Sequence, residues 1–227
     1  MMKSWENLPK FMRTQAVFHY YDSLSRKPIS LLAKTVFDRI MALILLLALS
    51  PILIGLSIAI KMDSPGPVFF RQKRVTQYGR VFYIYKFRTM VQNAEALGAQ
   101  VTTQSDSRIT KIGSRLRHTR LDELPQVINI LLGDMSFVGT RPEVPKYVEQ
   151  YTDSMKATLL LPAGVTSRAS IAFKDEEQLL ANAEDVDITY VTEVLPRKMK
   201  WNLESLENFS FWGDITTMID TVVAVLQ

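Results

Sequence analysis

The feature that most constrains this chain is an uncharged stretch of 21 residues, from Ile40 to Ile60. As a helix it would be about 31 Å long, close to the thickness of the hydrocarbon core of a bilayer. Length and hydropathy alone therefore predict a helix that crosses a membrane.

Two further features argue against a crossing. Ser50-Pro51 lies at the midpoint of the stretch, where proline removes a helical hydrogen bond and kinks the axis. Lys and Arg favour the cytoplasmic side of a membrane, and here they flank both ends. We therefore favour a re-entrant hairpin, which enters one leaflet and returns, over a crossing helix or a buried helix of a soluble domain. The flanking cations are Lys34 and Arg39 before the stretch and Lys61, Arg71, Lys73 and Arg74 after it.

Composition narrows the possible chemistry. The chain has 227 residues, no cysteine and two histidines, which excludes disulfides, thiolate metal sites and multi-histidine metal centres. Residues 1–120 hold 19 Lys/Arg against 6 Asp/Glu, whereas residues 121–227 hold 8 against 17. A basic half beside an acidic half predicts an anionic partner, such as a phosphate on a lipid, a nucleotide or a nucleic acid.

The most informative polar residues are the adjacent carboxylates Asp122 and Glu123, which follow a run of cations. Proline is tolerated only in the first turn of a helix, so Pro125 predicts that a helix starts here with Asp122 as its N-cap. The helix dipole would then help to keep Asp122 ionised, as an attacking carboxylate or a metal ligand must be. The simpler interpretation is a helix cap with a surface glutamate. The buried face of this helix is predicted from Leu124, Val127, Ile128, Leu131 and Leu132.

Basic residues occur where a phosphate could approach these carboxylates. Residues 68–75 and 81–87 alternate like two strands of a hairpin, and Lys86 and Arg88 share one face of the second strand. Arg117 precedes Asp122 by five residues, and Arg141 lies in a glycine-rich segment where it could bind phosphate in a bidentate manner. The structural alternatives are an ordinary amphipathic hairpin and a solvated charged face.

These motifs together resemble the bacterial sugar transferases, the small monotopic phosphoglycosyl transferases. The resemblance covers roughly residues 34–145 and is specific as a set, although each motif is weak alone. The matching segments are the Ser-Pro-interrupted apolar stretch, Lys86-Phe87-Arg88-Thr89-Met90, Leu121-Asp122-Glu123-Leu124-Pro125-Gln126, and Gly133-Asp134-Met135-Ser136-Phe137-Val138-Gly139 followed by Arg141-Pro142.

The resemblance implies a reaction and roles for particular residues. A sugar-1-phosphate would move from a nucleoside diphosphate sugar, expected to be a UDP-sugar, to polyprenyl (undecaprenyl) phosphate through a covalent intermediate on Asp122. Glu123, with Asp122, would be associated with Mg²⁺, and Lys86, Arg117 and Arg141 would contact phosphate. The reaction would be the first membrane step of exopolysaccharide, capsule, O-antigen or glycoprotein glycan assembly.

The sequence departs from the family pattern in two places. Thr140 stands where many members have proline. Residues 164–168 do not continue into the usual motif, and Lys174 lies near the position of a family arginine. The second departure leaves the sugar-side contacts, and hence the substrate, undefined.

The sequence therefore predicts a mostly helical α+β protein with a β-hairpin and amphipathic interfacial helices around a small catalytic core. We expect three regions: an arm over residues 1–33 that either lies on a membrane or packs loosely, a re-entrant membrane helix over 34–61 broken at Ser50-Pro51, and a cytoplasmic catalytic domain over 62–227. The expected location is the cytoplasmic face of a bacterial inner membrane. We expect no nucleic-acid partner and leave a homodimer open. The competing hypothesis is a non-catalytic membrane-anchored module that binds anionic lipid or nucleic acid.

The first testable prediction is that both ends of the apolar stretch face the cytoplasm. Because the chain has no cysteine, single Val36→Cys and Ser64→Cys variants each carry one reactive thiol. Both should resist an impermeant thiol reagent in intact cells and react after permeabilisation. Labelling of only one variant in intact cells would instead indicate a crossing helix.

Overall fold

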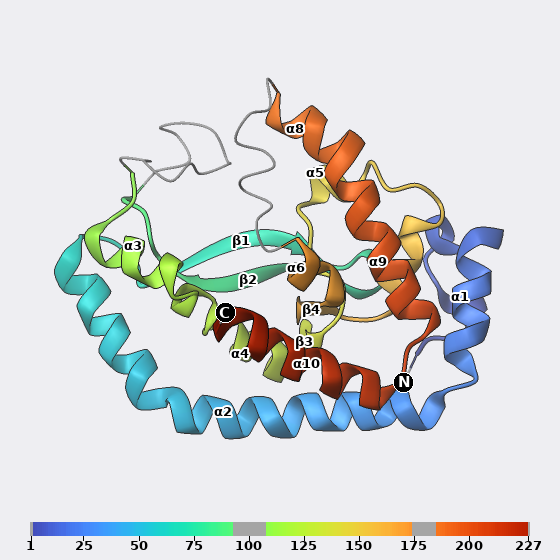
Figure 1. Cartoon of the computed structure of the whole chain (residues 1–227), viewed down its shortest axis with the longest axis horizontal. Coiled ribbons are helices and arrows are strands. Elements are labelled where there is room, and N and C mark those ends of the chain that lie inside the picture. Colours follow the sequence, from blue (N-terminus) through green and yellow to red (C-terminus); the bar gives the residue numbers. More distant parts are fainter. Residues whose placement is uncertain (1, 93–107, 174–184, 227) are drawn as a thin grey trace.

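The computed structural model describes residues 2–92, 108–173 and 185–226. These residues are mostly helical, with two small two-stranded sheets, as Figure 1 shows. The predicted class is thus confirmed in its helical content and its β-hairpin. The longer helices are α1 (Gln15–Ser25), α2 (Pro28–Asp63), α3 (Lys111–His118), α4 (Gln126–Leu132), α9 (Leu195–Glu207) and α10 (Phe211–Leu226). The short helices are α5 (Pro145–Val148), α6 (Arg168–Ala172) and α8 (Val186–Thr189), the 3₁₀ segments η1 (Trp5–Asn7), η2 (Lys10–Met12), η3 (Gln77–Gly79), η5 (Leu121–Glu123) and η6 (Met155–Leu160), and the π-helical turn η7 (Tyr190–Val194).

The apolar stretch lies within α2, a single helix of 36 residues with Pro51 inside it. The expected break at Ser50-Pro51 does not interrupt the helix, which continues through these residues, and the re-entrant course of the helix stays a prediction. Figure 1 shows that its axis bends between a long part along the lower edge and a shorter rising part. Pro51 supplies a physical cause for such a bend, since its missing N–H and its ring disturb the preceding turn. The placement of both ends on one side of a membrane stays a prediction.

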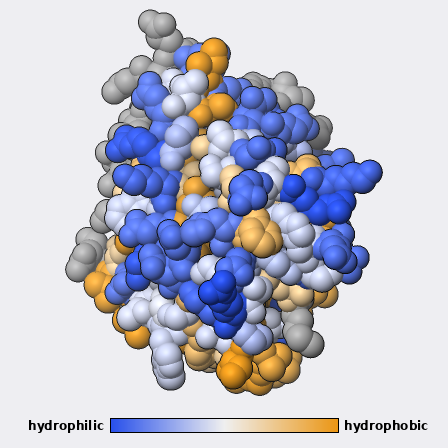
Figure 2. All heavy atoms as spheres, turned by 90° about the vertical axis from the view of Figure 1, so that its right-hand side faces the viewer, coloured by the Kyte–Doolittle hydropathy of each residue, from blue (hydrophilic) through white to orange (hydrophobic). Residues whose placement is uncertain are grey.

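Exposed apolar side chains gather on α2 and α10. By length and composition α2 could cross a membrane, and only 6% of its most apolar window is buried inside the protein. This exposure argues against the core helix of a soluble domain. Figure 2 shows hydrophobic residues along the lower edge of the molecule, where α2 runs in Figure 1. The exposed apolar residues of these helices are Ile29, Leu32, Val36, Ile40, Leu43, Ile44, Leu47, Ile52, Ile54, Ile58 and Met62 of α2, and Trp212, Ile219, Val222 and Val223 of α10.

The N-terminal arm is part of the main core, so the expectation of loose packing is wrong. Met12, Val17 and Leu24 are fully buried against residues of η6 and α9. At the end of the arm, the Lys27 Nζ donates hydrogen bonds to the carbonyl oxygens of Glu207 and Phe209. The arm therefore joins the start of the chain to the last turn of α9.

The predicted hairpin is confirmed as strands β1 (Phe69–Val75) and β2 (Val81–Phe87), which pair antiparallel. One face of β2 carries Phe82 and Ile84, both buried against α4. Because side chains alternate along a strand, Lys86 lies on this same face, two residues further on. The register pairs Lys86 with Phe70. The hairpin therefore directs Lys86 toward the residues just before α4.

A second sheet consists of the parallel strands β3 (Met135–Val138) and β4 (Ala163–Thr166). Beyond β3 the pairing continues, since Gly139 N donates to Thr166 O and Gly164 N donates to Thr140 O. The two chains approach closely at Gly139 and Gly164. A Cβ atom on Gly164 would stand 2.1 Å from Gly139 N, so only glycine fits.

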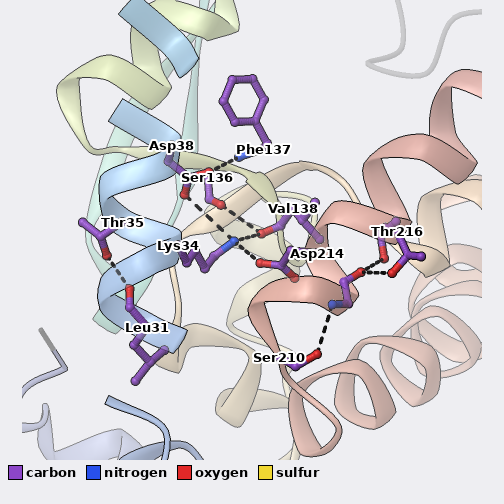
Figure 3. A network of polar contacts seen from close by, with 12 residues as sticks. Leu31, Lys34, Thr35, Asp38, Ser136, Phe137, Val138, Ser210, Asp214 and Thr216 are labelled. Atoms are coloured by element: carbon purple, nitrogen blue, oxygen red, sulfur yellow. Dashed lines mark hydrogen bonds and ion pairs between the residues drawn. The ribbon is translucent and has the colours of Figure 1, made fainter. Parts of the chain in front are cut away.

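A buried ion network connects α2 and α10 to the end of β3, as Figure 3 shows. The Lys34 Nζ donates to Val138 O and to a carboxylate oxygen of Asp214, each at 2.7 Å. Asp38, one turn along α2, accepts a hydrogen bond from Phe137 N. The apolar helix is therefore fastened to the strand that precedes Arg141.

The close approach of β3 and β4 leads to the second prediction. Gly164→Ala forces two backbones apart and should lower the free energy of unfolding by about 1–3 kcal/mol, in the range of overpacked cores. The matched control is Gly55→Ala in α2, where an added Cβ meets nothing within 4 Å. Thermal unfolding of the detergent-solubilised protein tests both. An unchanged midpoint for Gly164→Ala would contradict the packing described here.

Candidate active site

Asp122 and Glu123 lie in η5, a short 3₁₀ turn that leads into α4. The prediction that Asp122 is the N-cap of the helix is wrong, because α4 begins at Gln126 with Pro125 at the cap position. Arg120, just before the turn, adopts the left-handed conformation with φ of 54°. The chain thus ends α3 and re-enters helical geometry within a few residues, which places the two carboxylates at the corner between α3 and α4.

Glu123 forms the centre of a buried ion cluster. Its Oε1 accepts hydrogen bonds from the Lys86 Nζ at 2.7 Å and from the Arg141 Nη2, and its Oε2 accepts one from the Arg141 Nη1 at 3.3 Å. The Glu123 side chain is only 16% exposed. The arrangement brings together three residues that the sequence singled out, from η5, β2 and the segment after β3.

Asn129 aligns α4 with the strand that carries Lys86. Its Oδ1 accepts from Tyr85 N and its Nδ2 donates to Tyr83 O, both at 2.9 Å. Asn129 is completely buried, and its two bonds give partners to a backbone N–H and a backbone C=O at the free edge of β2. Sequence reasoning missed this residue. A polar side chain within an apolar helix was the signal, since buried amides need specific partners.

Arg141 reaches Glu123 because the segment after β3 is fixed by its neighbours. Gly139 and Thr140 pair with β4, and the Arg141 Nη1 also donates to Val165 O at 3.4 Å. The β3–β4 sheet therefore determines where the guanidinium lies, which local sequence could not show.

Burial and charge act in opposite directions on the ionisable groups of the site. Burial by itself would raise the pKa of Glu123, but the charges of Arg141 and Lys86 outweigh it and hold that pKa well below its usual range. Burial lowers the pKa of Lys86, and Glu123 partly offsets this effect. Burial also raises the pKa of Asp122, against the opposing influence of Lys86 and Arg117. The helix dipole at an N-cap position would lower the pKa of Asp122, whereas burial raises it here.

The remaining candidate residues have different environments. Arg117, half-buried at the end of α3, is close enough to Asp122 to favour its ionised form. Arg88 is not in the cluster, because its guanidinium turns to the last turn of α2 and donates to the carbonyl oxygens of Ser64 and Pro65. The prediction that Arg88 binds phosphate therefore has no geometric support. Lys174 lies outside the described residues.

The donor set near Asp122 and Glu123 suits a magnesium ion bound together with phosphate. Within the described part of the chain no group of three or more His, Cys, Asp or Glu side chains could hold a metal. Magnesium is usually held by one or two carboxylates plus substrate phosphates, so two adjacent carboxylates suffice. Of about four lone-pair positions on Glu123, three accept the hydrogen bonds described above, and one on Oε2 is left.

Comparison with known proteins identifies the family. The sequence profile described as bacterial sugar transferase matches residues 29–227. The chain belongs to the bacterial sugar transferase family. The match begins at the second residue of α2 and includes the whole site, whereas most of the N-terminal arm precedes it.

Curated relatives in this family carry related names. The chain is 35% identical over 207 residues to the UDP-N-acetylgalactosamine-undecaprenyl-phosphate N-acetylgalactosaminephosphotransferase of Aeromonas hydrophila, a match that covers 90% of this chain and 46% of that protein. It is 36% identical over 199 residues to the UDP-glucose:undecaprenyl-phosphate glucose-1-phosphate transferase of Xanthomonas campestris pv. campestris, which covers 86% and 39%. The chain thus spans less than half the length of these two relatives, and their names differ in the sugar.

The third prediction concerns the ion cluster and pH. The pKa of Glu123 is depressed in the folded protein, so the cluster contributes fully above the ordinary value of 4.5 and less as pH falls below it. Glu123→Gln leaves Lys86 and the partly exposed Arg141 without their charged partner and should lower the unfolding free energy at pH 7 by about 1–3 kcal/mol. The difference from wild type should shrink between pH 4.5 and pH 3.

Denaturant titrations at several pH values measure this difference. Glu193→Gln, at an exposed position of η7, is the matched control and should change stability little at any pH. A Glu123→Gln deficit that is constant from pH 7 to pH 3 would contradict the assigned role of the ionised carboxylate.

Proposed function

We propose that this protein is a phosphoglycosyl transferase that moves a sugar-1-phosphate from a nucleoside diphosphate sugar to polyprenyl phosphate, with Asp122 as the nucleophile. The observation that carries the proposal is the position of Asp122 beside the cluster of Glu123, Lys86 and Arg141, with Arg117 nearby. Phosphoryl transfer needs a placed nucleophile and neutralisation of the phosphate charge, and this corner supplies both. Membership of the bacterial sugar transferase family supports the same reaction class.

The reaction proceeds in two displacements at one phosphorus atom. An oxygen of the ionised Asp122 carboxylate bonds to the β-phosphorus, and the bond from that phosphorus to the bridging oxygen breaks. The nucleoside monophosphate leaves with the bonding electron pair, and an acyl-phosphate to the sugar remains on Asp122. An oxygen of polyprenyl phosphate then attacks the same phosphorus, which releases the Asp122 carboxylate and forms a polyprenyl diphosphate sugar.

The cations of the site contribute positioning and charge. Lys86 and Arg141 hold Glu123 and bring two positive charges to this corner, where they would neutralise the charge of a diphosphate. The Arg141 side chain is 34% exposed, so a ligand can reach it. Arg117 favours the ionised form of Asp122 and would face the departing phosphate. A substrate sugar of different stereochemistry would leave these phosphate contacts unchanged.

Glu123 and Asp122 are the residues that would hold a magnesium ion as cofactor. When bound, the ion would supply neutralisation of the diphosphate charge. Lys86 and Arg141 would orient the phosphates, and Asp122 would supply the attacking carboxylate.

The membrane location follows from the exposed apolar faces of α2 and α10. We infer that α2 is re-entrant, with both ends on the cytoplasmic face of a bacterial inner membrane, so that the protein is monotopic. Such an anchor places the site near the head groups, where the phosphate of a polyprenyl lipid lies. The donor is inferred to be a UDP-sugar, in keeping with the relatives' names.

The fourth prediction is that Asp122 becomes covalently loaded when a donor and Mg²⁺ are supplied without lipid acceptor. Intact-protein mass after rapid quenching should show one added sugar-phosphate, sensitive to hydroxylamine as an acyl-phosphate is. Asp122→Asn keeps the size of the side chain but removes its charge, and should abolish both the adduct and the release of nucleoside monophosphate. A panel of nucleotide sugars, with UDP-glucose and UDP-N-acetylgalactosamine included, identifies the donor.

The matched control is Asp220→Asn, an exposed carboxylate of α10, which should load and turn over like wild type. A fully active Asp122→Asn protein would remove the proposed nucleophile. Equal binding of anionic lipid by wild type and Asp122→Asn, without turnover of any nucleotide sugar, would favour the non-catalytic module instead.

A further inference from the structure

The reaction outlined above does not use a second buried ionic cluster, which begins two residues after Arg141. Its centre is Glu143, two residues after Arg141 and only 7% exposed. The Glu143 carboxylate accepts a hydrogen bond from the Tyr190 hydroxyl at 2.5 Å and forms an ion pair with the Lys198 Nζ at 3.6 Å. Lys198 in turn donates to the Tyr190 hydroxyl at 3.1 Å.

The partners of Glu143 come from a distant part of the chain. Tyr190 begins η7, and Lys198 lies in α9, roughly two helical turns further on. Both side chains are about 95% buried. A π-helical turn is wider than an α-helical one and often occurs at functional sites. Here it is the turn whose first residue supplies the hydroxyl that binds Glu143.

The backbone on either side of Glu143 is also fixed. The Arg74 Nη1 donates to Pro142 O at 3.0 Å, and Val75 N donates to Glu143 O at 2.9 Å. On the other side, Thr140 and Gly139 pair with β4. The short segment that carries Arg141 is therefore held between the end of β1 and the end of the β3–β4 pairing, and the buried Glu143 side chain adds a third attachment.

Charge makes Glu143 more than a packing residue. Arg74 lies close enough to Arg141 for their positive charges to repel, and the Glu143 carboxylate, which also pairs with Lys198, is the strongest opposing charge on Arg74. Like charges in a poorly solvated region repel strongly unless a counter-charge lies between them. Without Glu143, this repulsion would act on Arg141, whose guanidinium must stay in contact with Glu123.

We propose that Glu143, held by Tyr190 and Lys198, is a positioning residue that keeps Arg141 oriented for the phosphates of the donor. The proposal rests on the function proposed above and extends it to the C-terminal helices, which supply the support for a phosphate-binding arginine. Glu143 acts only through Arg141, so its removal should matter only while Arg141 is present. A residue that only stabilised the fold would instead have the same effect on donor binding with or without Arg141.

A double-mutant cycle on the full-length detergent-solubilised protein tests the dependence. The probe is UDP with Mg²⁺, and its dissociation constant is measured by calorimetry for wild type, Glu143→Gln, Arg141→Ala and the double variant. Glu143→Gln should weaken UDP binding about tenfold in the wild-type background and less than about twofold in the Arg141→Ala background. An equal factor in both backgrounds would overturn the proposal.

A second pair of variants keeps the test valid if Glu143→Gln folds poorly. Tyr190→Phe removes one hydroxyl and keeps the ring, and should show the same dependence on Arg141. Its matched control is Tyr147→Phe, because the Tyr147 ring lies 4.7 Å from that of Tyr190 while its hydroxyl bonds to the exposed Asp187. Tyr147→Phe should bind UDP like wild type, and an equal loss in both tyrosine variants would overturn the role of the Glu143 contact.

Failure of this inference is distinguishable from failure of the proposed function. If wild type binds UDP and releases nucleoside monophosphate from a nucleotide sugar, but the cycle is additive, only the positioning role is wrong. If wild type neither binds UDP nor turns over any nucleotide sugar, the proposed function itself is overturned, and the positioning role with it.

Discussion

The contact of one buried carboxylate, Glu123, with two cations is the interaction on which the rest of this structure depends. Lys86 comes from a β-hairpin, Arg141 from the segment after a parallel strand, and Glu123 from the turn before α4. Each charge is costly to bury alone, whereas together they satisfy one another. The three elements can therefore coexist in the interior only in the arrangement that also places Asp122 beside the cations.

Besides its expected role as a membrane anchor, the apolar helix α2 forms hydrogen bonds with β3, α4 and α3. The Lys34 Nζ binds the end of β3. The Arg39 guanidinium donates to Ile130 O in α4, and the Asp63 carboxylate accepts from Ile112 N at the start of α3. Polar side chains on a largely apolar helix thus hold the elements that carry Arg141, Glu123 and Arg117. A disturbance of α2 would therefore reach the Glu123 cluster through these few hydrogen bonds.

The sequence predicted the elements better than their ends and contacts. Alternation of apolar and polar residues placed β1 and β2 correctly, because one face of the hairpin packs on α4 and the other does not. The apolar spacing after Asp122 also indicated a helix correctly. The N-cap was misplaced because a 3₁₀ turn precedes the helix, and Pro125 is compatible with both geometries. Arg88 was expected beside Lys86 because the two residues alternate along one strand, whereas Arg88 lies beyond the strand and its guanidinium binds the end of α2.

By itself the sequence determined the membrane-suited helix, the hairpin, the adjacent carboxylates and the family, since these depend on local composition and spacing. Only the tertiary structure decided which cations meet Glu123, that α2 continues through Pro51, and that residues 2–27 belong to the core. The Glu143–Tyr190–Lys198 cluster also appeared only there, because its members are separated by up to 55 residues in the sequence. Contacts of this kind depend on burial and on the need to pair every buried charge, and neither is visible until distant segments have packed together.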